Sequence, residues 1–413
     1  MKSNTLKRFT DSKITSFDFI ILTIVLSLII YGNLRLLGFS KNDDSWMLLE
    51  NPFVINAKFS AKYFISIFSE FYGGQYSPVN TLYYVVLYKI FGPNPLYFHL
   101  GSLLLHTINT YLIYIFINQI LIFIQHKNLL IAPLVAILWC IHPLNVESVV
   151  WISASKIPLY SFFGLLSLIR YLKFLVSKSK LIFLFSVVAF LISCLCKEQA
   201  VLLCMMVVLL HYLFAKDTKW YFVLPFVTIM LIFTVIGFLT SQDDGQLSLV
   251  YDHLSLSHRI LLSIYSICFY IFNSILPLKL SYYYPFEFSS SSNPSVQLYV
   301  FPIILFSLVF LMLSIKKQIN WKIILVGSLT FGINLLLSVH LMPLHRQSML
   351  ANRYAYIPLI GILLIIIYLV FYGLDSIKHK STPYYTIVLL LIYGGYLLYS
   401  SSSLVFQYAQ YNI

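Results

Sequence analysis

The stretch SFDFIILTIVLSLIIYGNLRLLGFSKNDDSW, residues 16–46, decides the fold class. It opens with an almost unbroken apolar run that is long enough, as a helix, to cross the roughly 30 Å hydrocarbon core of a bilayer. The basic residues before this run resemble the start of a signal peptide, but no small-residue cleavage site follows. We therefore expect a retained membrane-spanning helix, followed by two adjacent acids, Asp43 and Asp44, just beyond the membrane edge.

The rest of the chain repeats this pattern. Of its 413 residues, 60% are hydrophobic and only 10% are charged, whereas soluble domains carry about 25% charged residues. The sequence therefore predicts an all-α polytopic membrane protein, a single domain over 1–413 with about 11 transmembrane helices. The predicted spans are 17–36, 95–124, 129–142, 158–176, 181–196, 199–215, 220–240, 297–315, 322–342, 354–372 and 384–403.

The net charge of +13 reflects membrane topology and does not indicate a nucleic-acid partner. The connections that this set of spans places on the inner side hold 16 of the 27 Lys and Arg but only 4 of the 14 Asp and Glu. Such an excess of basic residues is the signature of cytoplasmic loops. We expect an inner N-terminus and no basic patch interleaved with base-stacking aromatic residues.

Three outer segments are too long or too polar to be simple connectors. Residues 37–94 form a first outer loop with predicted interfacial helices, 241–296 form a second outer segment, and 342–358 form the third. The apolar stretch 258–277 would place the basic loop at 315–322 outside if it crossed the membrane. We therefore expect 258–277 to lie on the outer face or to re-enter from it.

Several types of chemistry have no signature in this sequence. The five cysteines lie in or beside apolar segments, which predicts neither a disulfide framework nor a zinc site. No glycine-rich phosphate loop, HExxH motif or nucleophile elbow is present. We therefore expect no certain cofactor and no dedicated metal ligands, although a divalent cation is compatible with the acids.

Asp43 and Asp44 allow two interpretations. Two adjacent carboxylates in a partly desolvated pocket repel each other, which suits a general base that takes a proton from a hydroxyl. Alternatively, the NDD sequence caps a helix by satisfying free backbone donors.

Five stretches, taken in order, resemble the membrane core of the transmembrane and tetratricopeptide-repeat O-mannosyltransferases and their bacterial relatives. They are NPFVI at 51–55, YSPVNTLYYVVLYKIFGPNPLYFHLGSLLLHTINTYLIY at 76–114, LWCIHPLNVESVVWISASK at 138–156, CKEQAV at 196–201 and ANRYAYIPLIGI at 351–362. More distantly, the layout is similar to the protein O-mannosyltransferases, which also carry an acidic pair in the first outer loop. The resemblance covers nearly the whole chain, but the repeat domain that follows the last span in that family is absent from this sequence.

The resemblance implies a GT-C fold and a glycosyltransferase that uses a polyprenyl-phosphate sugar, with mannose as the family's sugar. It implies that Asp43 or Asp44 is the base, and we favour Asp43 with Asp44 in support. With no machinery for a covalent intermediate visible, a single displacement with inversion is the simplest mechanism. The acceptor is a protein, lipid or glycan hydroxyl.

His99 and His106 lie two helical turns apart, so both side chains share one face of the second span. They are either hydrogen-bonded histidines in the bundle interior or residues that contact the sugar or acceptor in a wet cavity. The family resemblance favours the cavity, more so for His99.

Pro143 breaks a helix, and Glu147 and Trp151 follow one turn apart. We expect both to face the outer cavity, where Glu147 either holds a hydroxyl or pairs with Lys156. Trp151 either stacks on a sugar or anchors the chain at the interface. Lys156 either binds the donor phosphate or extends its ammonium to the membrane surface.

Two further pairs complete the predicted site. Lys197 and Glu198 form either a turn pair or a contact with the cavity, Lys197 with the phosphate and Glu198 with the sugar or acceptor. Arg353 is the favoured phosphate ligand because guanidinium matches phosphate bidentately, and the adjacent Tyr354 is assigned to the sugar or acceptor. The alternative for Arg353 is an interfacial anchor.

Two other classes of protein compete with a glycosyltransferase. A secondary transporter or flippase should show broken spans and charges near the midplane in two related halves. Here most of the charge lies at the outer rim, and no internal repeat is evident. A non-catalytic subunit of a glycan assembly system would tolerate loss of both Asp43 and Asp44. We expect a multi-pass protein of the bacterial inner membrane with a periplasmic active site, or alternatively of the ER membrane with a luminal one.

Overall fold

A computed structural model describes residues 16–40, 43–243, 256–278, 280–285, 303, 319–341, 348–376 and 382–411. Within these ranges the regular structure is helical and contains no β-strand. The predicted all-α class is therefore confirmed. The predicted span 297–315, apart from residue 303, lies outside the described residues, as do residues 244–255, 279 and 286–296 of the second outer segment.

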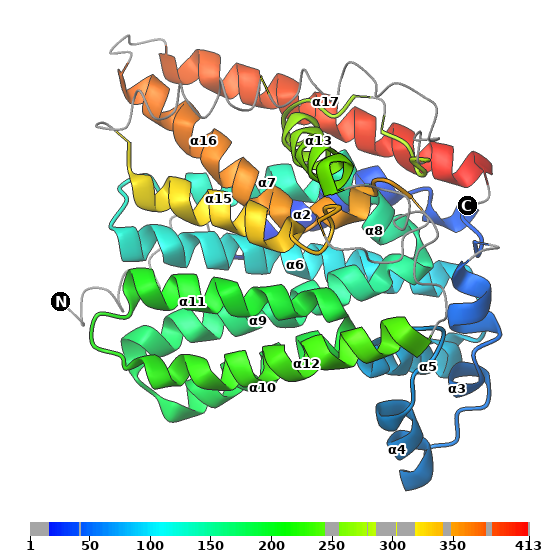
Figure 1. Ribbon diagram of the computed structural model, residues 1–413. Coiled ribbons are helices and arrows are strands. Elements are labelled where there is room, and N and C mark those ends of the chain that lie inside the picture. The colour runs from blue at the N-terminus through cyan, green and yellow to red at the C-terminus, as the bar shows by residue number, and fades with distance from the viewer. Residues whose placement is uncertain are drawn as a thin grey trace.

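Ten helices correspond to predicted spans and lie lengthwise beside one another (Figure 1). They are α2 (Ser16–Tyr31), α6 (Pro95–Ile124), α7 (Ile131–Cys140), α9 (Lys156–Ser177), α10 (Lys180–Cys196), α11 (Leu203–Phe214), α12 (Leu224–Asp243), α15 (Trp321–Leu335), α16 (Pro358–Ser376) and α17 (Thr382–Tyr411). The central helix, α6, contacts α2, α7 and α9, while α9 also packs on α10 and α16 packs on α7 and α15.

Local sequence explains where several helices begin. Asn94 caps α6 by accepting a hydrogen bond from the backbone N–H of Leu96, and Pro95 occupies the first helical position. Helix α6 ends at Gln125, which adopts a left-handed conformation. The same Asn-Pro arrangement starts the short helix α3 (Pro52–Ile55) in the first outer loop.

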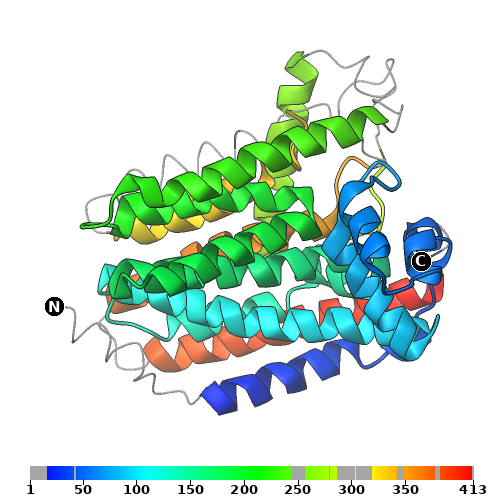
Figure 2. The ribbon, with the colours of Figure 1, turned by 90° about the horizontal axis from the view of Figure 1, so that it is seen from below.

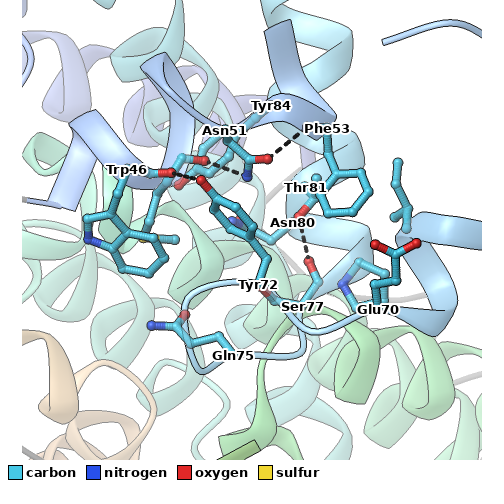
Figure 3. Close-up of a pocket in the computed structure, with 13 residues that line it drawn as sticks. Trp46, Asn51, Phe53, Glu70, Tyr72, Gln75, Ser77, Asn80, Thr81 and Tyr84 are labelled. Atoms are coloured by element: carbon cyan, nitrogen blue, oxygen red, sulfur yellow. Dashed lines mark hydrogen bonds between the residues drawn. The ribbon is translucent and has the colours of Figure 1, made fainter. Parts of the chain in front are cut away.

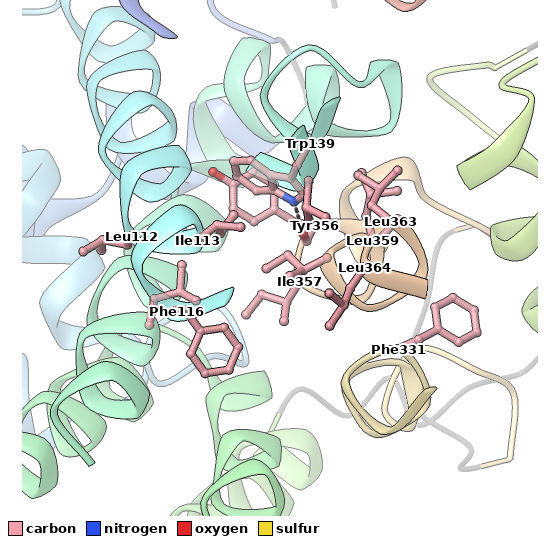
Figure 4. Close-up of a cluster of buried hydrophobic side chains, with 14 of the residues drawn as sticks. Leu112, Ile113, Phe116, Trp139, Phe331, Tyr356, Ile357, Leu359, Leu363 and Leu364 are labelled. Atoms are coloured by element: carbon pink, nitrogen blue, oxygen red, sulfur yellow. Dashed lines mark hydrogen bonds between the residues drawn. The ribbon is translucent and has the colours of Figure 1, made fainter. Parts of the chain in front are cut away.

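The interior of the bundle is mainly apolar, with buried polar side chains placed among the apolar ones. Ile113 and Phe116 of α6 meet Trp139 of α7 and the start of α16 (Figure 4). The Trp139 indole N–H donates to the Tyr356 carbonyl at 2.7 Å, so the one polar atom of this large side chain is satisfied. This contact joins the third predicted span to the tenth.

The number of spans is not confirmed. Six described helices are long and apolar enough to cross a membrane, or seven if the bent pair Ile131–Cys140 and Pro143–Val150 forms one span. That pair bends by 55°, in agreement with the predicted break at Pro143. Helix α7 is therefore shorter than the predicted 129–142. Four further apolar helices are shorter than a full span.

The two ends of the bundle differ as the charge pattern predicts. The α6–α7, α9–α10 and α11–α12 connections, which the sequence assigns to the inner side, gather at one end of the bundle (Figure 1). Helices α3, α4 (Ala61–Ser69) and α5 (Pro78–Phe91) gather at the other end. Helix α13 (Leu256–Ile275) is seen nearly end-on in Figure 1 and stands across the bundle in Figure 2. By length and composition α13 is one of the six helices that could cross a membrane, so the expectation that 258–277 lies on the outer face or re-enters from it stays a prediction.

The first outer loop folds into short helices. These are η2 (Ser45–Leu49), α3, α4 (Ala61–Ser69) and α5 (Pro78–Phe91). Helix α4 exposes the large apolar side chains Phe64, Ile65 and Phe68, which supports a position at the membrane interface.

Candidate active site

The segment Trp151–Lys156 is the centre around which the predicted site residues gather. It follows α8 (Val146–Val150), forms the short turn η4 (Ile152–Ser155) and leads directly into α9. Tyr84 of α5 donates its hydroxyl to the Ile152 carbonyl at 2.9 Å and accepts from Ser155 Oγ at 2.9 Å. These bonds attach the first outer loop to the start of α9.

Asp44 also binds the segment 151–156, through hydrogen bonds to Ser153. Its carboxylate is buried and accepts hydrogen bonds from Ser40 N at 2.7 Å, from Ser153 N at 2.9 Å and from Ser153 Oγ. Burial raises the pKa of Asp44, and the Asp43 carboxylate adds to this, although the bonds from Ser153 and Ser40 oppose it. Asp44 therefore has mainly a structural role, because its hydrogen bonds join the first outer loop to the segment that contains Ser153.

Asp43 is the more accessible acid of the pair. It is half-buried, and its Oδ1 accepts a hydrogen bond from the Trp46 indole N–H at 3.2 Å. Because one carboxylate oxygen remains outside this bond, Asp43 has the geometry that a proton acceptor needs.

Lys156 lies near two other cations, Lys197 and Arg353, and these three residues are called the cation cluster. Lys156 donates to Gln75 Oε1 at 2.6 Å, and its ammonium interacts electrostatically with Lys197 and Arg353. The Glu198 and Asp43 carboxylates also act on Lys156. Lys156, Lys197 and Arg353 come from three segments that are far apart in the sequence. Lys197 and Arg353 are each paired with a carboxylate, Glu198 and Glu147, whereas Lys156 is hydrogen-bonded to a neutral amide oxygen. Lys156 is therefore the cation of this cluster that is best placed to bind an added anion.

Arg353 is held by a carboxylate and two aromatic rings. It lies on η8 (Asn352–Ala355), where its backbone N–H donates to Glu147 Oε2 at 3.0 Å and its guanidinium pairs with Glu147 Oε1. The guanidinium carbon lies 4.6 Å from the centre of the Trp151 ring and 5.1 Å from that of Tyr354. The suggested pairing of Glu147 with Lys156 is therefore wrong, because Glu147 is used by Arg353.

Lys197 and Glu198 lie at the turn between α10 and η5 (Glu198–Leu202). The Lys197 ammonium is 3.1 Å from Glu198 Oε1. The Lys197 side chain is only 8% exposed and that of Glu198 is 50% exposed. The lysine thus points into the protein, towards Lys156, and the glutamate partly faces solvent.

The two histidines lie away from this cluster. His106 is fully buried, with Nδ1 3.1 Å from the Tyr356 hydroxyl and Nε2 3.0 Å from the Cys140 carbonyl. His99 is buried beside Gly38 without a hydrogen bond of good geometry. For His106, these contacts fit the interior interpretation that the sequence left open, because both ring nitrogens are already used.

Sequence reasoning missed four residues that hold the site together. Ser40 and Ser153 bind Asp44, Trp46 binds Asp43, and Gln75 binds Lys156. Small hydroxyl residues after the helix break in WISASK were the available signal for Ser153. The contact of Gln75 spans 81 residues of sequence, and no local pattern predicts it.

A small pocket lies in the first outer loop, and none of Asp43, Lys156, Lys197 and Arg353 lines it (Figure 3). Trp46, Tyr72 and Gln75 line it together with Glu70 and the start of α5. Trp46 and Gln75 thus belong both to this pocket and to the contacts of Asp43 and Lys156. Among the described residues, no group of three or more His, Cys, Asp or Glu side chains is arranged to hold a metal ion.

Comparison with known proteins adds a distant relative. No protein-family model matches the chain. Over 396 residues, 91% of the chain, it is 24% identical to the Caenorhabditis elegans protein O-mannosyl-transferase F38B6.6. The chain spans 55% of the length of that relative. The long apolar helices support a multi-pass membrane protein, and the relative that the chain resembles is named as an O-mannosyl-transferase.

Proposed function

We propose that the chain is a GT-C-type glycosyltransferase that moves a sugar from a polyprenyl-phosphate donor to an acceptor hydroxyl at the outer face of the membrane. The observation that supports this proposal is that Lys156 lies near Lys197, Arg353 and the half-buried Asp43 carboxylate. A lipid phosphate at the membrane edge is an anion that these cations fit. The similarity to an O-mannosyl-transferase makes mannose the first sugar to test.

In the proposed reaction, Asp43 takes the proton of the acceptor hydroxyl while the hydroxyl oxygen attacks the anomeric carbon. The bond from that carbon to the phosphate oxygen breaks, and its electron pair leaves with the phosphate. The negative charge that develops on the leaving group lies next to the three cations. One displacement inverts the configuration at the anomeric carbon.

The remaining residues support these two roles. Glu147 fixes Arg353 in place through both its backbone and its guanidinium, and the Trp151 ring lies beside the guanidinium. The partly exposed Glu198 and the half-buried Tyr354 border the cations and are the candidates for contact with the sugar or acceptor. The described residues supply no ligand set for a divalent cation, so no step is assigned to one.

Transfer by the purified full-length chain tests the proposal. The protein is reconstituted in lipid and given radiolabelled polyprenyl-phosphate sugars, mannose first, with hydroxyl acceptors of protein, lipid and glycan type. We expect transfer from at least one donor. We also expect Lys156→Met to raise the donor KM about tenfold or more through loss of a charged phosphate contact.

A well-folded chain that transfers no sugar from any donor would contradict the proposal. Lys58→Met is the matched control, because Lys58 is an exposed lysine of the same outer loop and lies outside the cation cluster. Its donor KM should equal that of the wild type. Movement of the intact donor lipid across the bilayer without transfer would favour the transporter alternative.

A further inference from the structure

A two-glycine turn in the first outer loop touches both halves of the proposed site. The backbones of Tyr72 and Gln75 exchange two hydrogen bonds of 3.1 Å, which close the turn. Between them, Gly73 and Gly74 have φ angles of +55° and +66°. Residues with a Cβ rarely adopt this left-handed region, so the turn requires glycine.

The turn lies directly on the indole of Trp46. A Cβ built on Gly73 would approach Trp46 Cζ3 to 2.3 Å, which leaves no room for a side chain. The Tyr72 hydroxyl donates to the Trp46 carbonyl at 3.1 Å, and the two ring centres are 6.2 Å apart. Figure 3 shows Trp46, Tyr72 and Gln75 around the same pocket.

One end of this arrangement binds the proposed base, Asp43, and the other end binds the proposed phosphate ligand, Lys156. The Trp46 indole N–H donates to Asp43 Oδ1 at 3.2 Å. Gln75 Oε1 accepts from the Lys156 ammonium at 2.6 Å. A continuous series of contacts therefore runs from the carboxylate through the indole and the glycine turn to the ammonium.

We propose that Trp46 and the turn Tyr72–Gln75 set the position of the Asp43 carboxylate relative to the Lys156 ammonium. This inference rests on the proposed function. Trp46 and Gln75 are positioning residues, because they hold the base and the phosphate ligand and need not touch the reacting atoms. Trp46 acts on the chemical step through the base, whereas Gln75 acts on donor binding through Lys156.

Two variants test these separate roles, because one should change only kcat and the other only the donor KM. Trp46→Phe keeps an aromatic ring at this position but removes the N–H donor to Asp43, together with the indole atoms that lie against Gly73. We expect kcat to fall about tenfold with the donor KM unchanged, because a misplaced base slows only the chemistry. Gln75→Met keeps the length of the side chain but cannot accept from Lys156. We expect it to raise the donor KM about fivefold with kcat nearly unchanged.

A matched pair of glycine variants tests the turn itself. Gly73→Ala and Gly92→Ala both place a side chain at a positive φ, +55° and +68° respectively. Only Gly73 meets Trp46, whereas nothing lies within 4 Å of a Cβ on Gly92. We expect Gly73→Ala to lower kcat/KM for the donor about fiftyfold and Gly92→Ala to leave it within about twofold of the wild type.

The outcomes separate this inference from the proposed function. If the wild-type chain transfers no sugar, the proposed function fails and the inference fails with it. If the wild type is active and Asp43→Asn is not, but Trp46→Phe and Gln75→Met keep both constants, the inference alone is overturned. Gel filtration monitors folding. If Trp46→Phe is not recovered as a folded protein, the two glycine variants decide instead. Equal kcat/KM values for the donor in Gly73→Ala and Gly92→Ala would then overturn the inference.

Discussion

Asp43 and Asp44 are neighbours in sequence but lie in different environments. Asp44 is buried against three donor groups from Ser40 and Ser153, while Asp43 is half-buried and bonded to Trp46. The sequence suggested a division between base and support, and the contacts supply a physical reason for it. A carboxylate whose oxygens are all engaged by the protein is a poor proton acceptor for a substrate.

Asp44 should make wild-type stability depend on pH. Because burial raises its pKa, the folded state binds the proton more tightly than the unfolded state. Its contribution to stability is full below the ordinary carboxyl pKa and is lost as the pH rises through the raised value. Wild type should therefore gain stability relative to Asp44→Asn, which cannot titrate, as the pH falls from neutral to about 4.5.

Thermal unfolding of both proteins at the two pH values measures this difference. At neutral pH, Asp44→Asn should already be less stable by about 1–3 kcal/mol, because its amide group faces the N–H and O–H donors. Asp217→Asn is the matched control, since Asp217 is an exposed acid in the connection between α11 and α12, at the opposite end of the bundle. If the difference in free energy of unfolding between wild type and Asp44→Asn became smaller at low pH, the raised pKa of Asp44 would be contradicted.

At the scale of elements, α15 and α16 cross at a pair of glycines. A Cβ on Gly361 would lie 2.2 Å from the Gly327 carbonyl oxygen, and a Cβ on Gly327 would lie 2.7 Å from that of Gly361. Small residues let two helices in a membrane approach this closely. This contact helps to fix α16 and therefore the Arg353 segment that precedes it.

Gly327→Ala should separate α15 from α16, whereas Gly332→Ala should not. Gly332 lies on the same helix, and nothing lies within 4 Å of a Cβ built there. Overpacking at Gly327 should cost about 1–3 kcal/mol, measured as a lower unfolding midpoint in detergent. Equal midpoints for the two variants would show that the crossing does not need glycine.

The helices could be predicted from the sequence where apolar length or a proline marks their bounds. Apolar length located ten helices, and Pro143 located the bend after α7. The short helices of the first outer loop were less defined, because their apolar residues face an interface that composition does not specify. The contacts of Asp44 with Ser153 and of Lys156 with Gln75 could not be predicted, since each joins segments distant in sequence.

At the scale of the whole molecule, the proposed reaction requires that the cation cluster and α3–α5 lie on the same side of the membrane. The described cysteines, Cys140, Cys194, Cys196, Cys204 and Cys268, are all buried. A single introduced cysteine therefore reports the side on which it lies. This property allows a topology test without removal of native cysteines.

Cysteines introduced at two exposed lysines should react from opposite sides. Lys58 precedes α4 at the proposed outer end, and Lys127 lies in the connection between α6 and α7 at the inner end. An impermeant maleimide should label Lys58→Cys in intact right-side-out vesicles and label Lys127→Cys only after permeabilisation. Leu256→Cys and Leu276→Cys, at the two ends of α13, should both react from outside. Reaction of these two from opposite sides would make α13 a span.

Donor binding and single-turnover transfer by Asp43→Asn, compared with the wild type, test the central claim most directly. Asp43 is proposed to remove a proton and the cations to hold the phosphate. The variant should therefore bind the polyprenyl-phosphate sugar within about threefold of the wild-type affinity but transfer it at least about a hundredfold more slowly. Transfer at the wild-type rate by a folded Asp43→Asn protein would contradict the account.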